Sequence, residues 1–196
     1  GLIAAHIFPS MPLVDARPEP TMGHNALLRF RSSVVGDVTG QEFRPVTVRK
    51  AIWYGSEFHQ PSIRLANLYS MKVVGRLTNR SIWDIEPVTR WIAPPDFHDR
   101  LVESVGDRVT WGQSFDFTLA GYEPTISTAP MPTVLAQLGI EPGVEFVHAP
   151  IHVRRYRVDG ADVHQTIYFP GPETALYRAS ITGDLLICEF VSGTGS

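Results

Sequence analysis

The chain has 196 residues, a formal charge of -3 and 43% apolar residues, enough for one domain with a real hydrophobic core. The net negative charge argues against a nucleic-acid partner, and no apolar run approaches the roughly 18 residues that a membrane-spanning helix needs. Cys188 is the single cysteine, which excludes an internal disulfide and makes a reducing, cytoplasmic location the simplest expectation.

The first half of the chain predicts an arm followed by strands. Residues 1–24 are proline-rich and aperiodic, which predicts an extended or partly disordered arm, and residues 25–196 form the single predicted domain. The alternation in residues 43–55 predicts a strand, and residues 61–75 are its expected antiparallel partner. Residues 79–95 combine helix-like spacing with β-branched residues and a proline, and favour a short helix followed by an irregular stretch.

Two helices are predicted in the middle of the chain. Residues 94–107 carry an apolar stripe, which Asp96 can cap and Gly106 can end. Residues 108–124 predict a strand, and residues 129–143 predict a short amphipathic helix followed by a turn.

The last strands are expected over residues 144–158, 162–169 and 177–193, and Gly183 offers a turn in the third. The Asp-Gly pair at 159–160 fits a two-residue turn, which predicts that the first two of these strands pair as a hairpin. The whole pattern indicates an α+β fold with an antiparallel sheet and a few short helices on one side.

One late strand is unusually rich in arginine. The sequence "HVRRYRV" places Arg154, Arg155 and Arg157 so that guanidinium groups point to both of its faces. A buried unpaired guanidinium is very costly, so an arginine that faces the core needs a carboxylate from the protein or from a ligand. Two interpretations stay open. The arginines lie at a sheet edge and pair with acidic side chains, or they line an anion pocket on one face of the sheet.

The same region resembles a unit shared by two related families, chorismate pyruvate-lyase and the UTRA effector-binding domain of transcription factors. The matching pieces are "VLAQLGI", "EPG", "HVRRYRV", "DG" and "TIYFP", and the resemblance covers about residues 91–170. It implies an antiparallel sheet with helices on one side, enclosing a pocket for a small ligand. In the lyases an arginine grips the substrate carboxylate and a glutamate acts as acid, chemistry that needs no metal and no organic cofactor, so none is expected.

The resemblance also singles out site residues. Glu189 in "GDLLICEF" is the closest match to the family glutamate and is the predicted catalytic acid. Arg155 is the first choice for its partner or for the ligand clamp, and Arg154 and Arg49 follow.

His164 and Tyr168 share one face of the strand predicted over 162–169. His164 is a candidate proton shuttle, although a histidine on a sheet face is more often structural, and Tyr168 is a candidate substrate contact. His148 and His152 also share a face, but no third ligand stands at a suitable spacing, so no metal site is expected.

Two functions of different classes fit these features. The first, which we favour, is an enzyme that acts on a small aromatic or cyclic carboxylate by lyase or isomerase chemistry in an enclosed pocket. The second is a non-catalytic ligand-binding module of the UTRA kind, and a cyclase or dehydratase on another α+β scaffold is a third. The expected partner is a small-molecule carboxylate, with a homodimer as a further expectation, and neither nucleic acid nor a membrane.

Overall fold

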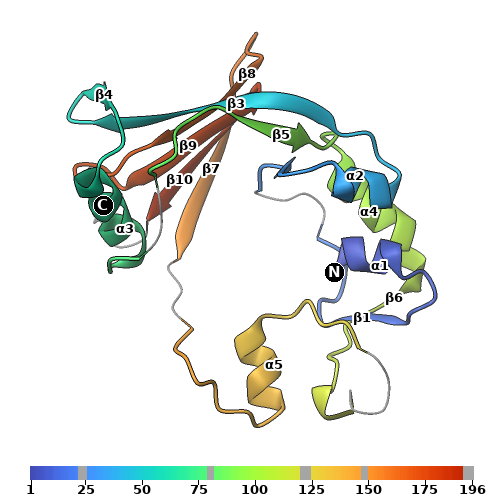
Figure 1. Ribbon diagram of the computed structural model, residues 1–196. Coiled ribbons are helices and arrows are strands. Elements are labelled where there is room, and N and C mark those ends of the chain that lie inside the picture. The colour runs from blue at the N-terminus through green and yellow to red at the C-terminus, as the bar shows by residue number, and fades with distance from the viewer. Residues whose placement is uncertain (22–25, 79–81, 120–124, 147–149, 192–196) are drawn as a thin grey trace. The chain divides into compact units, whose positions relative to one another are not determined.

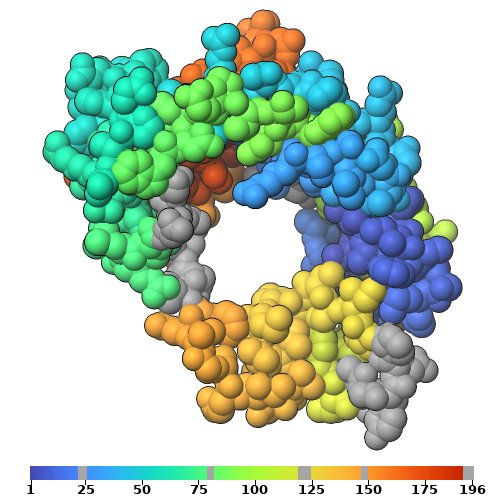
Figure 2. Space-filling model, in the orientation of Figure 1, coloured from blue at the N-terminus to red at the C-terminus, as the bar shows by residue number. Residues whose placement is uncertain are grey.

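The computed structural model describes residues 1–21, 26–78, 82–119, 125–146 and 150–191. The chain divides into two compact units, each built from three separate segments, which can be followed by their residue colours (Figure 1 and Figure 2). Unit 1 comprises Gly1–His24, Ser32–Phe43 and Ala93–Val147, and unit 2 comprises Asn25–Arg31, Arg44–Ile92 and His148–Ser196. Short helices and a mostly antiparallel sheet make the fold α+β, as predicted. Across the described ranges, each helix is too short or too polar to cross a bilayer.

Unit 1 is mainly helical. Its elements are α1 (Leu2–Ile7), β1 (Leu13–Asp15), α2 (Val34–Thr39), α4 (Phe97–Val105), η1 (Gly106–Arg108), β6 (Val109–Trp111), η2 (Phe117–Leu119) and α5 (Met131–Gln137). The helices α4 and α5 confirm the two predicted over residues 94–107 and 129–143. The segment predicted as an extended arm contains α1 and β1, and Arg108 holds it by donating hydrogen bonds to the carbonyls of Ala5 and Pro9. The strand predicted after α4 is short, and β6 pairs in parallel with β1.

Unit 2 is built around a curled sheet with the strand order β2-β5-β3-β8-β9-β10-β7. Its strands are β2 (Arg29–Phe30), β3 (Arg44–Tyr54), β5 (Val88–Ile92), β7 (Ile151–Arg157), β8 (Val163–Tyr168), β9 (Leu176–Gly183) and β10 (Leu185–Val191). A further short strand, β4 (Glu57–His59), pairs with the end of β3. The strands β3 and β8 run parallel, and the other pairings in the described part of this sheet are antiparallel.

Residues 61–75 form helix α3 (Ile63–Val74), not the strand that was predicted as the partner of β3. The Ser62 hydroxyl accepts a hydrogen bond from the Leu65 N–H and so caps the start of the helix. Gly75 ends the helix in the left-handed conformation, with a φ of 71°. These two end signals agree with a helical period that buries one face, and together they outweigh the loose alternation in the sequence. The buried face consists of Leu65, Ala66, Tyr69, Ser70 and Val73.

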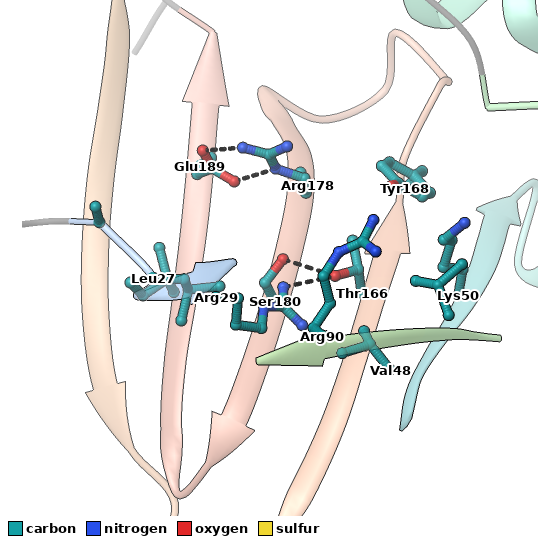
Figure 3. A pocket seen from close by; sticks show the side chains of 13 residues that line it. Leu27, Arg29, Val48, Lys50, Arg90, Thr166, Tyr168, Arg178, Ser180 and Glu189 are labelled. Atoms are coloured by element: carbon teal, nitrogen blue, oxygen red, sulfur yellow. Dashed lines mark hydrogen bonds and ion pairs between the residues drawn. The ribbon is translucent and has the colours of Figure 1, made fainter. Parts of the chain in front are cut away.

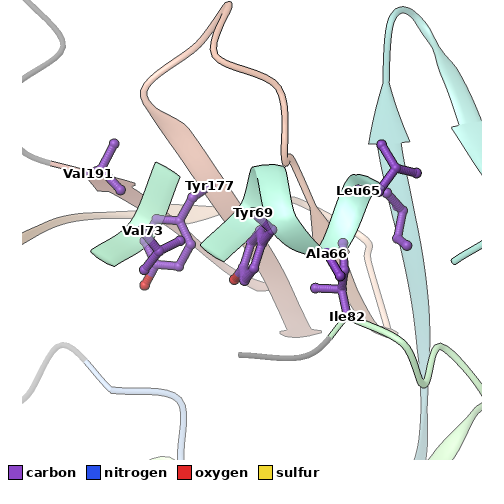
Figure 4. Packing of buried hydrophobic residues seen from close by; sticks show 8 residues of the cluster. Leu65, Ala66, Tyr69, Val73, Ile82, Tyr177 and Val191 are labelled. Carbon is purple, nitrogen blue, oxygen red and sulfur yellow. The ribbon is translucent and has the colours of Figure 1, made fainter. Parts of the chain in front are cut away.

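The main hydrophobic cluster of unit 2 lies where α3 packs against one end of the sheet (Figure 4). Ile52 near the end of β3, Tyr177 at the start of β9 and Val191 at the end of β10 all contribute to it. The ring of Tyr69 meets the ring of Tyr168 edge to face, with the centroids 5.5 Å apart. This packing leaves the middle of the sheet free to carry polar side chains.

The segment of residues 79–95 also differs from its prediction, because its described part contains strand β5 and no helix. As a strand, β5 has Val88, Arg90 and Ile92 on one face and Thr89 and Trp91 on the other. The long strand β3 offers β5 an edge with which to pair over five residues. Periodicity over so short a segment does not separate a helix from a strand, and the pairing with β3 decides the outcome.

The hairpin predicted around residues 159–160 is not formed. The strand β7 pairs with β10, and β8 lies between β3 and β9, so the two predicted partners lie three strands apart in the sheet order. Gly160 does turn the chain, with a φ of 71°, but a turn sets only a local change of direction. The register and partners of a strand depend on which faces become buried, and that information is not local. The turn predicted at Gly183 is confirmed, since β9 and β10 form a hairpin there.

Lys72 fastens the connection between β8 and β9 to helix α3. Its Nζ donates hydrogen bonds of 2.7 Å to the carbonyl oxygens of Phe169, Gly171 and Leu176. Burial lowers the pKa of Lys72 to about 8, so the ammonium group stays protonated at neutral pH and has three donors for three acceptors.

Candidate functional site

A polar pocket of about 380 Å³ lies on one face of the curled sheet in unit 2 (Figure 3). Side chains alternate between the faces of a strand, so every second residue of β3, β8, β9 and β10 points to this face. The strand registers align these side chains in two rows across the sheet. The rows are Lys50, Thr166, Ser180 and Ile187, and then Tyr168, Arg178 and Glu189. The remaining lining residues include Leu27, Arg29, Val48, Val88 and Arg90.

Arg29, on the short strand β2, reaches across the pocket to β8. Its Nη2 donates a hydrogen bond of 2.9 Å to the Thr166 hydroxyl, which lies 3.0 Å from the Ser180 hydroxyl. Two other strands separate β2 from β8 in the sheet order, so the sheet must curl to bring these groups together. The Nη1 of Arg29 is buried and has no hydrogen-bond partner among the described residues. A buried donor without a partner is costly, so Nη1 is a position where an acceptor from a ligand would be stabilising.

The charge of Arg29 lies in an unfavourable environment. Burial, and after it the positive charge of Arg178, lower the pKa of Arg29 to about 10, and Arg90 acts in the same direction. The guanidinium is still protonated at neutral pH, so the positive charge remains in the pocket. An anion beside Arg29 would relieve both the missing hydrogen bond and the repulsion.

Arg178 and Glu189 form a two-point ion pair from the neighbouring strands β9 and β10. Arg178 donates from Nη2 to Glu189 Oε1 at 2.6 Å and from Nε to Oε2, and the Tyr177 hydroxyl donates to Oε1 at 3.2 Å. Burial alone lowers the pKa of Arg178, but the hydrogen bonds and charge of Glu189 outweigh burial and raise that pKa above its ordinary value. Both carboxylate oxygens of Glu189 are therefore held as acceptors in a fixed position.

Positive charge exceeds negative charge around the pocket. The cationic side chains that line it are Arg29, Lys50, Arg90 and Arg178. Among the described residues that line it, Glu189 supplies the single carboxylate. The Lys50 side chain is 11% exposed, and its ammonium group donates to the backbone carbonyl of Asp84 at 3.0 Å and lies 3.4 Å from the Asp84 carboxylate. The excess of guanidinium groups over carboxylates suits an anionic ligand.

The pocket also offers apolar surface and a neutral donor. Val48, Val88 and Ile187 line it beside the charged groups. Burial raises the pKa of Tyr168, so its phenol stays protonated and can donate a hydrogen bond to an anion. A ligand with an anionic head and an apolar body would match this combination.

Two of the residues predicted from the sequence, Glu189 and Tyr168, line the pocket. The arginines predicted from the sequence do not line the pocket. Arg154 and Arg49 have exposed side chains on the opposite face of the sheet, and the Arg154 guanidinium lies over the Phe190 ring, 5.5 Å from its centroid.

Arg155, the predicted partner of Glu189, lies opposite Ile187 on the edge strand β7. Its side chain is exposed and does not line the pocket. The ion pair of Glu189 is with Arg178 instead, because β9 and β10 form a hairpin that places these two residues directly opposite each other.

His164 lies two residues before Thr166 on β8, on the same face, but outside the pocket. Its side chain is 12% exposed, and its Nδ1 is buried without a hydrogen-bond partner among the described residues. Its Nε2 lies 3.4 Å from both Arg44 Nη2 and Asp162 Oδ1. Burial and then the charge of Arg44 lower the pKa of His164 more than Asp162 raises it. The imidazole is therefore neutral at neutral pH, and its place outside the pocket favours the structural interpretation over a proton shuttle.

The lowered pKa of His164 predicts acid sensitivity. The unfolded chain binds the proton more readily than the folded one, so this residue's contribution to stability is complete above pH 6.5 and is lost as the pH falls through the lower folded pKa. We expect the free energy of unfolding to decrease below that pH, and to decrease less in His164→Gln, as measured by urea denaturation at several pH values. The control His152→Gln changes an exposed histidine on β7 and should keep the wild-type profile. A profile for His164→Gln as steep as that of the wild type would contradict this account.

The cationic residues that the structure adds to the site have only weak signals in the sequence. Arg178 and Ser180 alternate with apolar residues in "YRASI", and this pattern points a polar row to one face of β9. Arg29 and Arg90 have no such signal, because their strands are short and the curl of the sheet, not local sequence, brings them to the pocket.

The sequence predicted no metal site at His148 and His152; His148 lies outside the described residues, and His152 is exposed on β7. Within the described ranges, no three His, Cys, Asp or Glu side chains gather as a metal ion would require. Comparison with known proteins identifies no family: no protein-family model matches the chain, and neither does any curated protein.

Proposed function

We propose that the pocket in unit 2 binds a small organic anion, and that a carboxylate is the class of ligand it takes. The observation that carries this proposal is Arg29, a half-buried arginine whose Nη1 is buried and has no acceptor among the described residues. A guanidinium fork matches the two oxygens of a carboxylate in a plane, and such bonds are roughly twice as strong as neutral ones.

The surroundings of Arg29 support the same class of ligand. A carboxylate beside Nη1 would lie close to the Thr166 hydroxyl, which already accepts from Arg29. The body of the ligand would cover the half-buried side chain of Val88, which lies beside the buried Val48 and Ile187. Burial of this apolar surface would add to the affinity that the charge provides.

Binding without catalysis is the function that the geometry supports better. A general acid must carry a proton that it can give to the substrate. Both oxygens of Glu189 instead accept hydrogen bonds from Arg178, and Oε1 accepts a further one from Tyr177. Glu189 therefore has the arrangement of a carboxylate that positions Arg178, which agrees with the ligand-binding alternative.

Replacing Arg29 tests the proposal. We expect benzoate to bind the wild-type protein, and Arg29→Gln to weaken that binding at least about tenfold, since a charge-assisted pair contributes more than 1.4 kcal/mol. The measurement is isothermal titration calorimetry at constant ionic strength, with a thermal melt to show that the variant is folded. The control Arg49→Gln makes the same chemical change on the opposite face of β3 and should bind benzoate like the wild type. If Arg29→Gln bound benzoate as tightly as the wild type does, the proposal would be wrong.

A lyase of the chorismate pyruvate-lyase kind is the second candidate, and the observation in its favour is that Glu189 lines the pocket. Its test is to incubate the protein with chorismate and to assay for pyruvate and an aromatic acid. A lyase would release pyruvate, and Glu189→Gln would abolish that release. Absence of pyruvate, or equal release by the variant, would remove this candidate and leave the binding function.

A further inference from the structure

The cations of the pocket differ in how their charge is balanced. Arg178 is paired with Glu189, and Lys50 is within reach of the carboxylate of Asp84. Arg29 and Arg90 have no acidic partner among the described residues. The Nη1 of Arg90 donates to a backbone carbonyl, that of Thr89, at 3.0 Å, which leaves its charge unbalanced.

The sheet brings these two unbalanced charges together. The strands β2 and β5 are antiparallel, and Arg29 is directly opposite Ile92, so Arg90 is its diagonal neighbour on the same face. Diagonal neighbours have their Cβ atoms about 7 Å apart, and two arginine side chains are long enough for both guanidinium groups to reach one ligand across this distance. Figure 3 shows both side chains at the pocket, where each is part of the lining.

Two like charges in a partly buried site repel one another unless an anion lies between them. The charge of Arg90 is one of the causes that lower the pKa of Arg29, which is the electrostatic sign of this repulsion. A ligand with one negative charge could balance only one of the two guanidinium groups. A ligand with two negative charges could balance both, and each fork offers it a pair of parallel donors.

We propose that the pocket selects a doubly charged ligand, with Arg29 and Arg90 as its two anion-binding groups. This inference rests on the proposed function, since it specifies the charge of the anion that the pocket binds. The shared chemistry is a charge of two within reach of both forks, supplied either by two carboxylates on neighbouring carbons or by one phosphoryl group. The hydroxyls of Thr166 and Ser180 lie between β3 and β10 in the same row and offer a donor to a third ligand oxygen.

Three probes that share a phenyl ring separate charge from apolar contact. Benzoate carries one charge, phthalate carries two on separate carboxylates, and phenyl phosphate carries nearly two on one phosphoryl group at about pH 7.5. We expect phthalate or phenyl phosphate to bind the wild-type protein about tenfold more tightly than benzoate in calorimetric titrations at constant ionic strength. Whichever of the two binds more tightly identifies the source of the second charge.

The variant Arg90→Gln then tests whether Arg90 is the residue that binds the second negative charge of the ligand. It should reduce the ratio of dianion to benzoate affinity from about ten to about one, whereas Arg49→Gln should leave that ratio unchanged. Equal binding of all three probes by the wild type, or an unchanged ratio in Arg90→Gln, would overturn this inference while leaving the proposed function intact. If none of the probes binds, the proposed function fails, and this inference fails with it.

Discussion

Replacing Lys72 by methionine is expected to lower the free energy of unfolding by about 3 kcal/mol, because a charged hydrogen bond contributes about 1.5–3 kcal/mol and three of them share one donor. Methionine keeps most of the length and the apolar stem of lysine but has no N–H. The carbonyl oxygens of Phe169, Gly171 and Leu176 would lose their bonds to α3 together.

Guanidinium chloride denaturation followed by circular dichroism measures this loss. The other lysine of the chain provides a matched control, since Lys50→Met removes contacts to Asp84 alone. We expect that control to cost about 1 kcal/mol or less, because its acidic partner is exposed. A loss in Lys72→Met no larger than in Lys50→Met would show that the three bonds do not stabilise the fold.

The second large effect is expected at the ion pair of the pocket. Arg178→Met should cost about 2 kcal/mol, less than the 3–5 kcal/mol typical of a fully buried pair, because the Arg178 side chain is 39% exposed. Glu189 is 14% exposed and would keep one donor, the Tyr177 hydroxyl. A buried carboxylate with most of its donors removed is the main source of the loss.

A double-mutant cycle isolates the interaction within this pair. The variants Arg178→Met and Glu189→Gln and their combination should give a coupling energy above about 1 kcal/mol by denaturant titration. The exposed pair Arg157 and Asp184 at the edge of the same sheet is the control, with an expected coupling of about 0.5 kcal/mol or less. Equal coupling in the two pairs would mean that the position of Glu189 in the pocket adds nothing to its bond with Arg178.

Features with a local signal could be predicted from the sequence. The helices α4 and α5 have their own apolar stripes, and Gly183 marks the hairpin of β9 and β10. Glu189 could be singled out by its match to the family glutamate in "GDLLICEF", and Tyr168 by the alternation of its strand; both line the pocket.

Features that depend on strand pairing could not be predicted. The number of arginines in β7 made them candidates for an anion pocket. However, β7 is an edge strand, and the side chains of these arginines are exposed. The arginines that enter the pocket stand singly in β2, β5 and β9, far apart in the sequence. Only the order of the strands and the curl of the sheet bring them together, and neither is encoded within one short segment.

The parallel contact between β3 and β8 has a consequence for how the protein is made. Lys50 meets Thr166 in that pairing, more than 100 residues further along the chain, so the centre of the sheet cannot close until β8 has been synthesised. Contacts of such large sequence separation slow folding, and during that delay β3 has an open edge on the ribosome-bound chain. Early chaperone binding to β3, and refolding that is slow compared with that of a helical protein of equal size, are what this topology implies.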